Sequence, residues 1–260
     1  MPAGYRTLPA IYDRWQKTYG RDYTTLILPR LLRTIARHDI PGPLMLDVAS
    51  GTGSLAFMMA GRGWKVWGVD ASELMVAESM RKLVRKRAAV LFLHQDMREI
   101  RVPQKVSLAT SMFDSLNHLT TRQDLLRTFR GVARSLQPGG YFVFDMNNER
   151  CFRRLWIRTE TVDHSDFTLI LKNRYDRRTR RAYSFVTLFK KDGESYSRTG
   201  EIVKERYFPR SEVRGALARA GFRILECEDF NFTDVPEIGK IKTWWVARKS
   251  RNASSGLHHR

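Results

Sequence analysis

The chain has 260 residues, of which 42% are hydrophobic, and its 46 Lys and Arg against 27 Asp and Glu give a formal net charge of +19. A chain of this length can bury a full core as one α/β domain with a subdomain, so its stability requires neither disulfides nor a structural metal. Residues 1–6 lack the apolar core of a signal peptide, and no apolar stretch reaches the roughly 18 residues of a membrane span, so we expect a cytoplasmic protein outside the membrane.

Short apolar segments alternate with helical patterns through the first 150 residues, which is typical of βαβ units and a parallel sheet. Strands are predicted at 44–48, 65–70, 90–93, 106–110 and 141–144, and helices between them at 54–62, 72–87 and 121–136. Ser72 and Thr121 are predicted N-caps, because a hydroxyl at this position accepts a hydrogen bond from a backbone N–H of the first helical turn.

After Asn148 the pattern changes to long segments of alternating polarity, at 168–172, 183–189 and 200–207, which predict a three-stranded antiparallel meander. A helix at 211–220, ended by Gly221, and two strands at 222–226 and 243–247 complete the main sheet. We therefore predict an α/β fold. It comprises a doubly wound, mostly parallel, seven-stranded Rossmann-like sheet (41–149 and 208–249), an inserted antiparallel β subdomain (150–207) and a flexible tail (250–260).

A glycine loop follows the first predicted strand. The motif Gly51-x-Gly53-x-x-Ala56, with Asp70 at the end of the next strand, also satisfies the pattern of a dinucleotide-binding site. Asp47 distinguishes the two ligands, because a carboxylate at the tip of the first strand repels a pyrophosphate and attracts the ammonium and sulfonium groups of S-adenosylmethionine. Asp96 and Met97 follow the third strand, where a carboxylate can accept from the adenine amino group and an apolar side chain can cover the ring. The loop therefore favours S-adenosylmethionine.

The same segments carry a resemblance to a known family. They are LMLDVASGTGSLA (44–56), VWGVDASELM (66–75), LHQDMRE (93–99), SMFDSLNHL (111–119) and LQPGGYFVFDMN (136–147). In this order they resemble class I S-adenosylmethionine-dependent methyltransferases, which release S-adenosylhomocysteine as a product. The resemblance implies a cofactor site made by Tyr23, Asp47, Ala49, Ser50, Gly51, Gly53, Asp70, Ala71, Met75, Asp96, Met97 and Met112.

Within the class the chain is most similar to the branch of glycine and amino-sugar N-methyltransferases. The likeness lies in Asp47-Val48-Ala49, in Met112-Phe113-x-Ser115 followed by His118-Leu119, and in the leader pairs Tyr12-Asp13 and Asp22-Tyr23. The resemblance implies that residues 1–40 form a helical lid over the cofactor, and that Tyr12 and His118 approach the methyl acceptor.

The residues after the fourth strand bear on the acceptor. Methyl transfer from a sulfonium is a direct displacement, so a base is useful mainly when the acceptor is a protonated amine or an alcohol. His118 can act as that base near neutral pH, or it can instead bond to the backbone at a helix edge. Asp114 can bind an ammonium acceptor or cap the turn that follows it. We therefore predict a small-molecule acceptor, with an amine as the favoured class, which can also carry an anionic or phosphate group.

Two other functions are compatible with the sequence. The basic charge is spread along the chain. It is compatible with a methyltransferase that acts on RNA or another macromolecule, and with a non-catalytic module that binds the cofactor or nucleic acid. It is equally compatible with a solvated basic surface that has no partner. Ser111-Met112-Phe113-Asp114 departs from the Asn/Asp-Pro-Pro-aromatic tetrad of enzymes that methylate base amines. Cys151 and Cys227 have no CxxC spacing, so we expect no disulfide and no metal site, although Cys151 follows a strand end where sites form.

Overall fold

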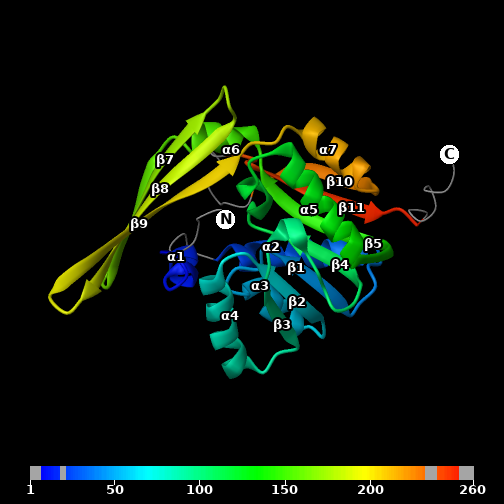
Figure 1. The fold of residues 1–260 in the computed structure, drawn as a ribbon, viewed down its shortest axis with the longest axis horizontal. Helices are drawn as coiled ribbons and strands as arrows, with labels where there is room; N and C mark the ends of the chain where they lie inside the picture. The colour runs from blue at the N-terminus through cyan, green and yellow to red at the C-terminus, as the bar shows by residue number, and fades with distance from the viewer. Residues whose placement is uncertain (1–6, 18–21, 232–238, 252–260) are drawn as a thin grey trace.

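The computed structural model describes residues 7–17, 22–231 and 239–251. It contains a seven-stranded sheet covered by helices and a four-stranded sheet that extends away from it (Figure 1). Most of the tail predicted to be flexible, from residue 252 onward, lies outside the described residues, as do residues 1–6 and 18–21 of the predicted lid. None of the helices in the described part of the chain combines the length and the hydrophobicity that a membrane span requires.

The predicted doubly wound sheet is confirmed. Its strand order is β10 (Phe222–Phe230), β11 (Lys242–Lys249), β5 (Leu136–Asn147), β4 (Val106–Ser111), β1 (Leu44–Val48), β2 (Lys65–Asp70) and β3 (Val90–His94). The strands from β3 to β5 are parallel to one another, and β11 is antiparallel to both of its neighbours. The carboxyl ends of β1, β2, β4 and β5 therefore meet at one edge, which is where ligands bind in open α/β sheets.

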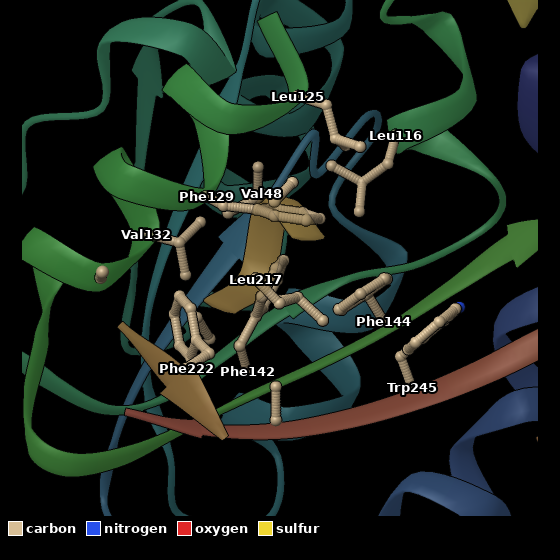
Figure 2. Packing of buried hydrophobic residues seen from close by; sticks show 14 of the residues in the cluster. Val48, Leu116, Leu125, Phe129, Val132, Phe142, Phe144, Leu217, Phe222 and Trp245 are labelled. Atoms are coloured by element: carbon tan, nitrogen blue, oxygen red, sulfur yellow. The ribbon is translucent and has the colours of Figure 1, made fainter. Parts of the chain in front are cut away.

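Helices cover both faces of this sheet. Their bounds are α1 (Tyr12–Lys17), α2 (Tyr23–Arg37), α3 (Ser54–Ala60), α4 (Glu73–Lys86), α5 (Arg122–Ser135), α6 (Glu149–Arg154) and α7 (Arg210–Arg219), with 3₁₀ turns η1 (Met97–Glu99) and η2 (Ser115–His118). Residues of α2, α3 and α4 pack on one face, and α5 and α7 pack on the other around Phe129, Phe142 and Trp245 (Figure 2).

The predicted caps are confirmed, since the hydroxyls of Ser72 and Thr121 accept from the backbone N–H groups of Met75 and Asp124. Leu136, which the sequence pattern assigned to the helix, instead begins β5.

The second sheet is antiparallel and has four strands where three were predicted. The order is β6 (Thr159–His164), β7 (Phe167–Asp176), β8 (Arg181–Asp192) and β9 (Ser195–Arg206). The sequence prediction missed β6 because it buries only Val162, so it lacks an apolar alternation of its own. One face of the sheet packs against Leu8 and Ile11, with Tyr12 and Trp15 at the margin. The leader segment thus lies between this sheet and the main one.

Candidate functional site

The loop between β1 and α3 depends on residues in the left-handed backbone region, with φ of 56° at Ala49, 54° at Gly51 and 81° at Gly53. The two glycines differ in their surroundings. A Cβ at Gly53 would lie 2.5 Å from Cζ of Phe92, whereas a Cβ at Gly51 would meet nothing within 4 Å. Gly53 is therefore required for packing, and Gly51 borders open space.

That space is a cavity of about 400 Å³ between the glycine loop and the leader helices. Of the residues expected to bind the cofactor, Tyr23, Asp47, Ala49, Ser50, Gly51 and Met112 line it, together with the predicted acceptor residue Tyr12. Gly53, Asp70, Ala71, Met75, Asp96 and Met97 are not part of its lining. The structure therefore brings together the residues that follow β1, the end of β4 and the leader.

A buried carboxylate, Asp47, and a half-buried one, Asp70, lie at this edge of the sheet. Asp47 is 3% exposed and accepts a hydrogen bond from Thr110 Oγ1 at 2.8 Å. Burial raises the pKa of Asp47 to about 7. Asp70 accepts from the backbone N–H groups of Gly51 and Ser72, each at 2.8 Å, and burial raises its pKa as well. A cationic ligand would stabilise the ionised form of both groups.

These features fit the phosphate-free cationic cofactor expected from the sequence. Ser50 lines the cavity, and its buried hydroxyl has no hydrogen-bond partner among the described residues. Gly51 leaves space that a Cβ would fill. The site thus offers a polar atom, a backbone cradle and a carboxylate on one wall, which suits an amino acid moiety.

The two residues expected to contact adenine, Asp96 and Met97, have other partners in this structure. Asp96 caps η1, and both of its oxygens face Arg98: Oδ1 accepts from the backbone N–H and from Nε, each at 2.9 Å, and Oδ2 accepts from Nη2 at 2.5 Å. Met97 is half-buried against the core that contains α5. Contact of Asp96 and Met97 with adenine stays a prediction.

A buried ion cluster fixes the loop after β4. Asp145 on β5 is fully buried and accepts from Tyr23 Oη at 2.6 Å, from the backbone N–H groups of Phe113 and Asp114 at 2.8 and 2.9 Å, and from Lys242 Nζ at 3.0 Å. Lys242 also pairs with Asp114. Phe113 and Asp114 have φ of 59° and 49°. Two successive non-glycine residues in this region are strained, so the Asp145 carboxylate holds the turn by binding both N–H groups.

His118, the predicted base, ends the 3₁₀ turn that follows this loop, and neither His118 nor Asp114 is part of the lining of the cavity that Tyr12 borders. His118 Nδ1 is 3.2 Å from the carbonyl oxygen of Lys204, and Nε2 is 3.8 Å from Oε1 of Glu205. Burial lowers the pKa of His118, while the nearby Asp114 carboxylate opposes that shift. Glu205 is 3% exposed and hydrogen-bonds Asn147 and Asp114, and its pKa is raised well above its usual range, first by burial and then by Asp114.

The leader helix is attached to the glycine loop by Asp13. Its carboxylate accepts from Thr52 Oγ1 at 2.6 Å and pairs with Lys82, whose Nζ also donates to the carbonyl oxygen of Thr52 at 3.1 Å. Burial, with the Asp114 carboxylate nearby, raises the pKa of Tyr12, so this phenol is neutral at physiological pH. Tyr12 is therefore suited to hydrogen bonding and to excluding water rather than to acting as a base.

The sequence analysis did not identify the buried residues that contact and position the loop after β4 and His118. Asp145 interrupts the buried run of β5, and a charged residue within such a run is a usable signal. Lys242 and Glu205 gave no comparable signal, because Lys242 is the first residue of the apolar strand β11 and Glu205 belongs to the alternating strand β9. Cys151 is buried with a pKa well above its usual value, which disfavours a nucleophilic role, and the described residues contain no group of three or more His, Cys, Asp or Glu that could hold a metal ion.

Known proteins with similar sequences and structures include methyltransferases. Residues 45–140 match a family described as a methyltransferase domain. The Bacillus subtilis methyltransferase candidate YqeM is 31% identical over 214 residues, which are 81% of this chain and 86% of that protein. The dTDP-3-amino-3,4,6-trideoxy-alpha-D-glucopyranose N,N-dimethyltransferase of Streptomyces venezuelae is 27% identical over 222 residues, 84% of this chain and 79% of that protein. A solved S-adenosylmethionine-dependent methyltransferase from Clostridium acetobutylicum has a TM-score of 0.80 at 22% identity, covering 95% of this chain and 99% of that chain.

Proposed function

This chain belongs to the class I S-adenosylmethionine-dependent methyltransferases, and we propose that it methylates an amine of a small acceptor. The observation that carries the proposal is His118, whose Nδ1 contacts a backbone carbonyl beside the carboxylate of Asp114. An amine acceptor needs a base and a counter-charge, and these two residues can supply both. The similarity to an amino-sugar N,N-dimethyltransferase supports the same class of acceptor.

Binding of the cofactor would use the residues expected from the sequence. We propose that Asp47 binds its ammonium group, that Ser50 and the glycine loop hold the methionine portion, and that Asp70 binds the ribose. The residues Ala71, Met75, Asp96 and Met97 would surround the adenine, and Met112 and Tyr23 would border the methionine end. When bound, the cofactor supplies a methyl group activated by a sulfonium, and it leaves as S-adenosylhomocysteine.

The protein's own residues prepare the acceptor. A carbonyl oxygen only accepts hydrogen bonds, so the contact with Lys204 places the proton of neutral His118 on Nδ1 and makes Nε2 the basic nitrogen. A lowered pKa keeps His118 unprotonated at neutral pH. Nε2 can then take a proton from an ammonium acceptor, which leaves the electron pair on the amine nitrogen for attack. Tyr12 and the leader helix would keep water out of the cavity.

Methyl transfer from labelled cofactor to panels of amines, amino sugars, phenols and RNA tests the proposal directly. We expect label on the nitrogen of an amine or amino sugar. Both a nucleotide-linked and an unlinked amino sugar belong in the panel, because the difference shows whether an anionic or phosphorylated acceptor is preferred. Label on phenols alone, or on RNA alone, would contradict amine methylation.

His118→Gln should lower kcat/KM for the amine by about 10²-fold or more near neutral pH, because the acceptor then loses its proton to water only. In the wild-type enzyme kcat/KM should fall as the pH drops through the lowered pKa of His118, since the protonated imidazole cannot accept a proton. The variant should lose this acidic limb and recover activity at alkaline pH, where the amine is already neutral. Identical pH profiles for the two proteins would show that His118 acts only through its backbone contact.

Affinity for S-adenosylmethionine should depend on pH through Asp47. The pKa of Asp47 in the free protein is about 7, and an ammonium ligand lowers it, so binding must ionise the carboxyl group at lower pH. Calorimetry should therefore show affinity falling by up to about 10-fold per pH unit below 7, and falling again above roughly 8 as the ligand amine loses its proton.

Asp47→Asn should bind more weakly and without the decline below pH 7. Asp96→Asn is the matched control, because Asp96 is engaged by Arg98 and should leave the pH dependence in place. If Asp47→Asn kept the wild-type pH dependence, another group would have to bind the ammonium.

A further inference from the structure

The four-stranded sheet has two faces of different character. Its inner face is buried where Leu169, Val186 and Val203 pack with Leu8 and Ile11 of the leader. Neighbouring side chains on a strand point to opposite faces. The residues between the buried ones therefore form an outer face, on a sheet that extends away from the main body of the protein (Figure 1).

A row of aromatic side chains follows β8 on this outer face, at Tyr183, Phe185 and Phe189. The strand register places basic residues beside each ring: Arg174 and Lys204 flank Tyr183, Lys172 is opposite Phe185, and Arg198 is opposite Phe189. Phe185 and its cross-strand partner Ile202 are each 43% exposed. Large apolar side chains are thus presented to solvent within a frame of positive charge.

The charge of the outer face is strongly basic. Its exposed basic residues are Lys172, Arg174, Arg181, Lys191, Arg198 and Lys204. None of them forms an ion pair with another residue in the described ranges. The acidic residues of this face, Asp163 and Asp176, stand at strand ends and already bind Thr168 and the turn at 178–179. Apart from Arg181, which lies across from Asp176, the basic residues of this face have no acidic cross-strand neighbour in the described strands.

We propose that this outer face binds single-stranded nucleic acid, with bases stacked on the aromatic row and phosphates beside the basic side chains. Aromatic rings provide stacking platforms for any base, and lysine and arginine neutralise the backbone. A second copy of the chain fits less well, because a two-fold interface would place this basic face against itself. The inference is independent of the methyl acceptor, since the face lies opposite the side that contacts the leader and His118.

Fluorescence anisotropy of the full-length protein with a labelled oligouridylate of about 12 nucleotides tests this inference. An oligothymidylate of equal length separates recognition of RNA from recognition of any single strand, and linear polyphosphate measures attraction by charge alone. We expect saturable binding of the oligonucleotides that weakens steeply with salt and exceeds the binding of polyphosphate.

Two double variants separate stacking from charge. Phe185→Leu with Phe189→Leu keeps the apolar surface but removes the rings, and should weaken binding by about 10-fold for each stacked base. Lys172→Ala with Arg198→Ala should reduce the slope of log K against log salt by about 1.4, because each phosphate contact contributes about 0.7. Arg219→Ala with Arg223→Ala removes the same charge from exposed positions elsewhere and should change neither quantity.

Calorimetry with S-adenosylmethionine and amine methylation, measured on the same variants, should be unchanged, so a failure of the nucleic-acid inference is distinguishable from a failure of the proposed function. Equal binding of polyphosphate and oligouridylate, with no effect of the leucine variant, would overturn the inference in favour of unspecific attraction. Absence of saturable binding, together with a dimer that Phe185→Leu with Phe189→Leu converts to a monomer, would identify the face as a self-association surface and also overturn it.

Discussion

Lys242→Met is expected to lower the free energy of unfolding by about 3–5 kcal/mol, because it leaves the buried carboxylate of Asp145 and the half-buried carboxylate of Asp114 without a cation. Lys242 is 1% exposed and binds Asp145 and Asp114. Burial by itself would lower the pKa of Lys242, but the two carboxylates raise it above its usual value. The ammonium is therefore charged at neutral pH. Without it, the desolvation energy of the two carboxylates is no longer offset by an ion pair.

Thermal unfolding followed by circular dichroism measures this effect, with an expected fall of roughly 10 °C in Tm. Lys249→Met on the same strand is the matched control, because Lys249 donates to the carbonyl oxygen of Leu136 and has no carboxylate partner in the described ranges. It should cost about 1 kcal/mol. Equal losses for the two variants would contradict the role assigned to the buried ion cluster.

The parallel half of the fold was predictable because its strands are short apolar runs with polar ends. The predicted bounds 44–48 and 65–70 coincide with β1 and β2, and the glycine loop between them follows from local sequence. The caps were predictable for the same reason, since a cap binds within one helical turn. Features of this kind depend on residues that are close together in the sequence, so the sequence alone predicts them.

The support beneath the site was not predictable, because its contacts are distant in the chain. Lys242 binds Asp145 across 97 residues and Asp114 across 128, and no local pattern specifies such pairs. Glu205 reaches His118 only because β9 returns beside the main sheet. The missed strand β6 is similar, since its place is set by pairing with β7 rather than by its own polar sequence. These features are therefore determined by contacts between segments distant in the chain, which local secondary-structure propensity does not predict.

The two loop glycines provide a prediction that separates folding from cofactor binding. Gly53→Ala should destabilise the protein by about 3 kcal/mol or more, because the residue has a φ of 81° and its Cβ would overlap Phe92 in the core. Gly51→Ala should cost only about 1 kcal/mol, because its φ of 54° is strained for alanine but its Cβ meets no protein atom.

For binding of S-adenosylmethionine, the ranking of the two substitutions should be the reverse of their ranking for stability. A methyl group at position 51 projects into the cavity, so Gly51→Ala should weaken binding by about 10- to 100-fold, a cost in the range of overpacking a tight site. Tm and calorimetry on both variants provide the comparison, with binding to Gly53→Ala measured well below its Tm. Normal affinity in a folded Gly51→Ala would mean that the cofactor does not approach the loop there. Because the same motif occurs in phosphate sites, this result would test whether the loop, and not Asp47 alone, recognises the ligand.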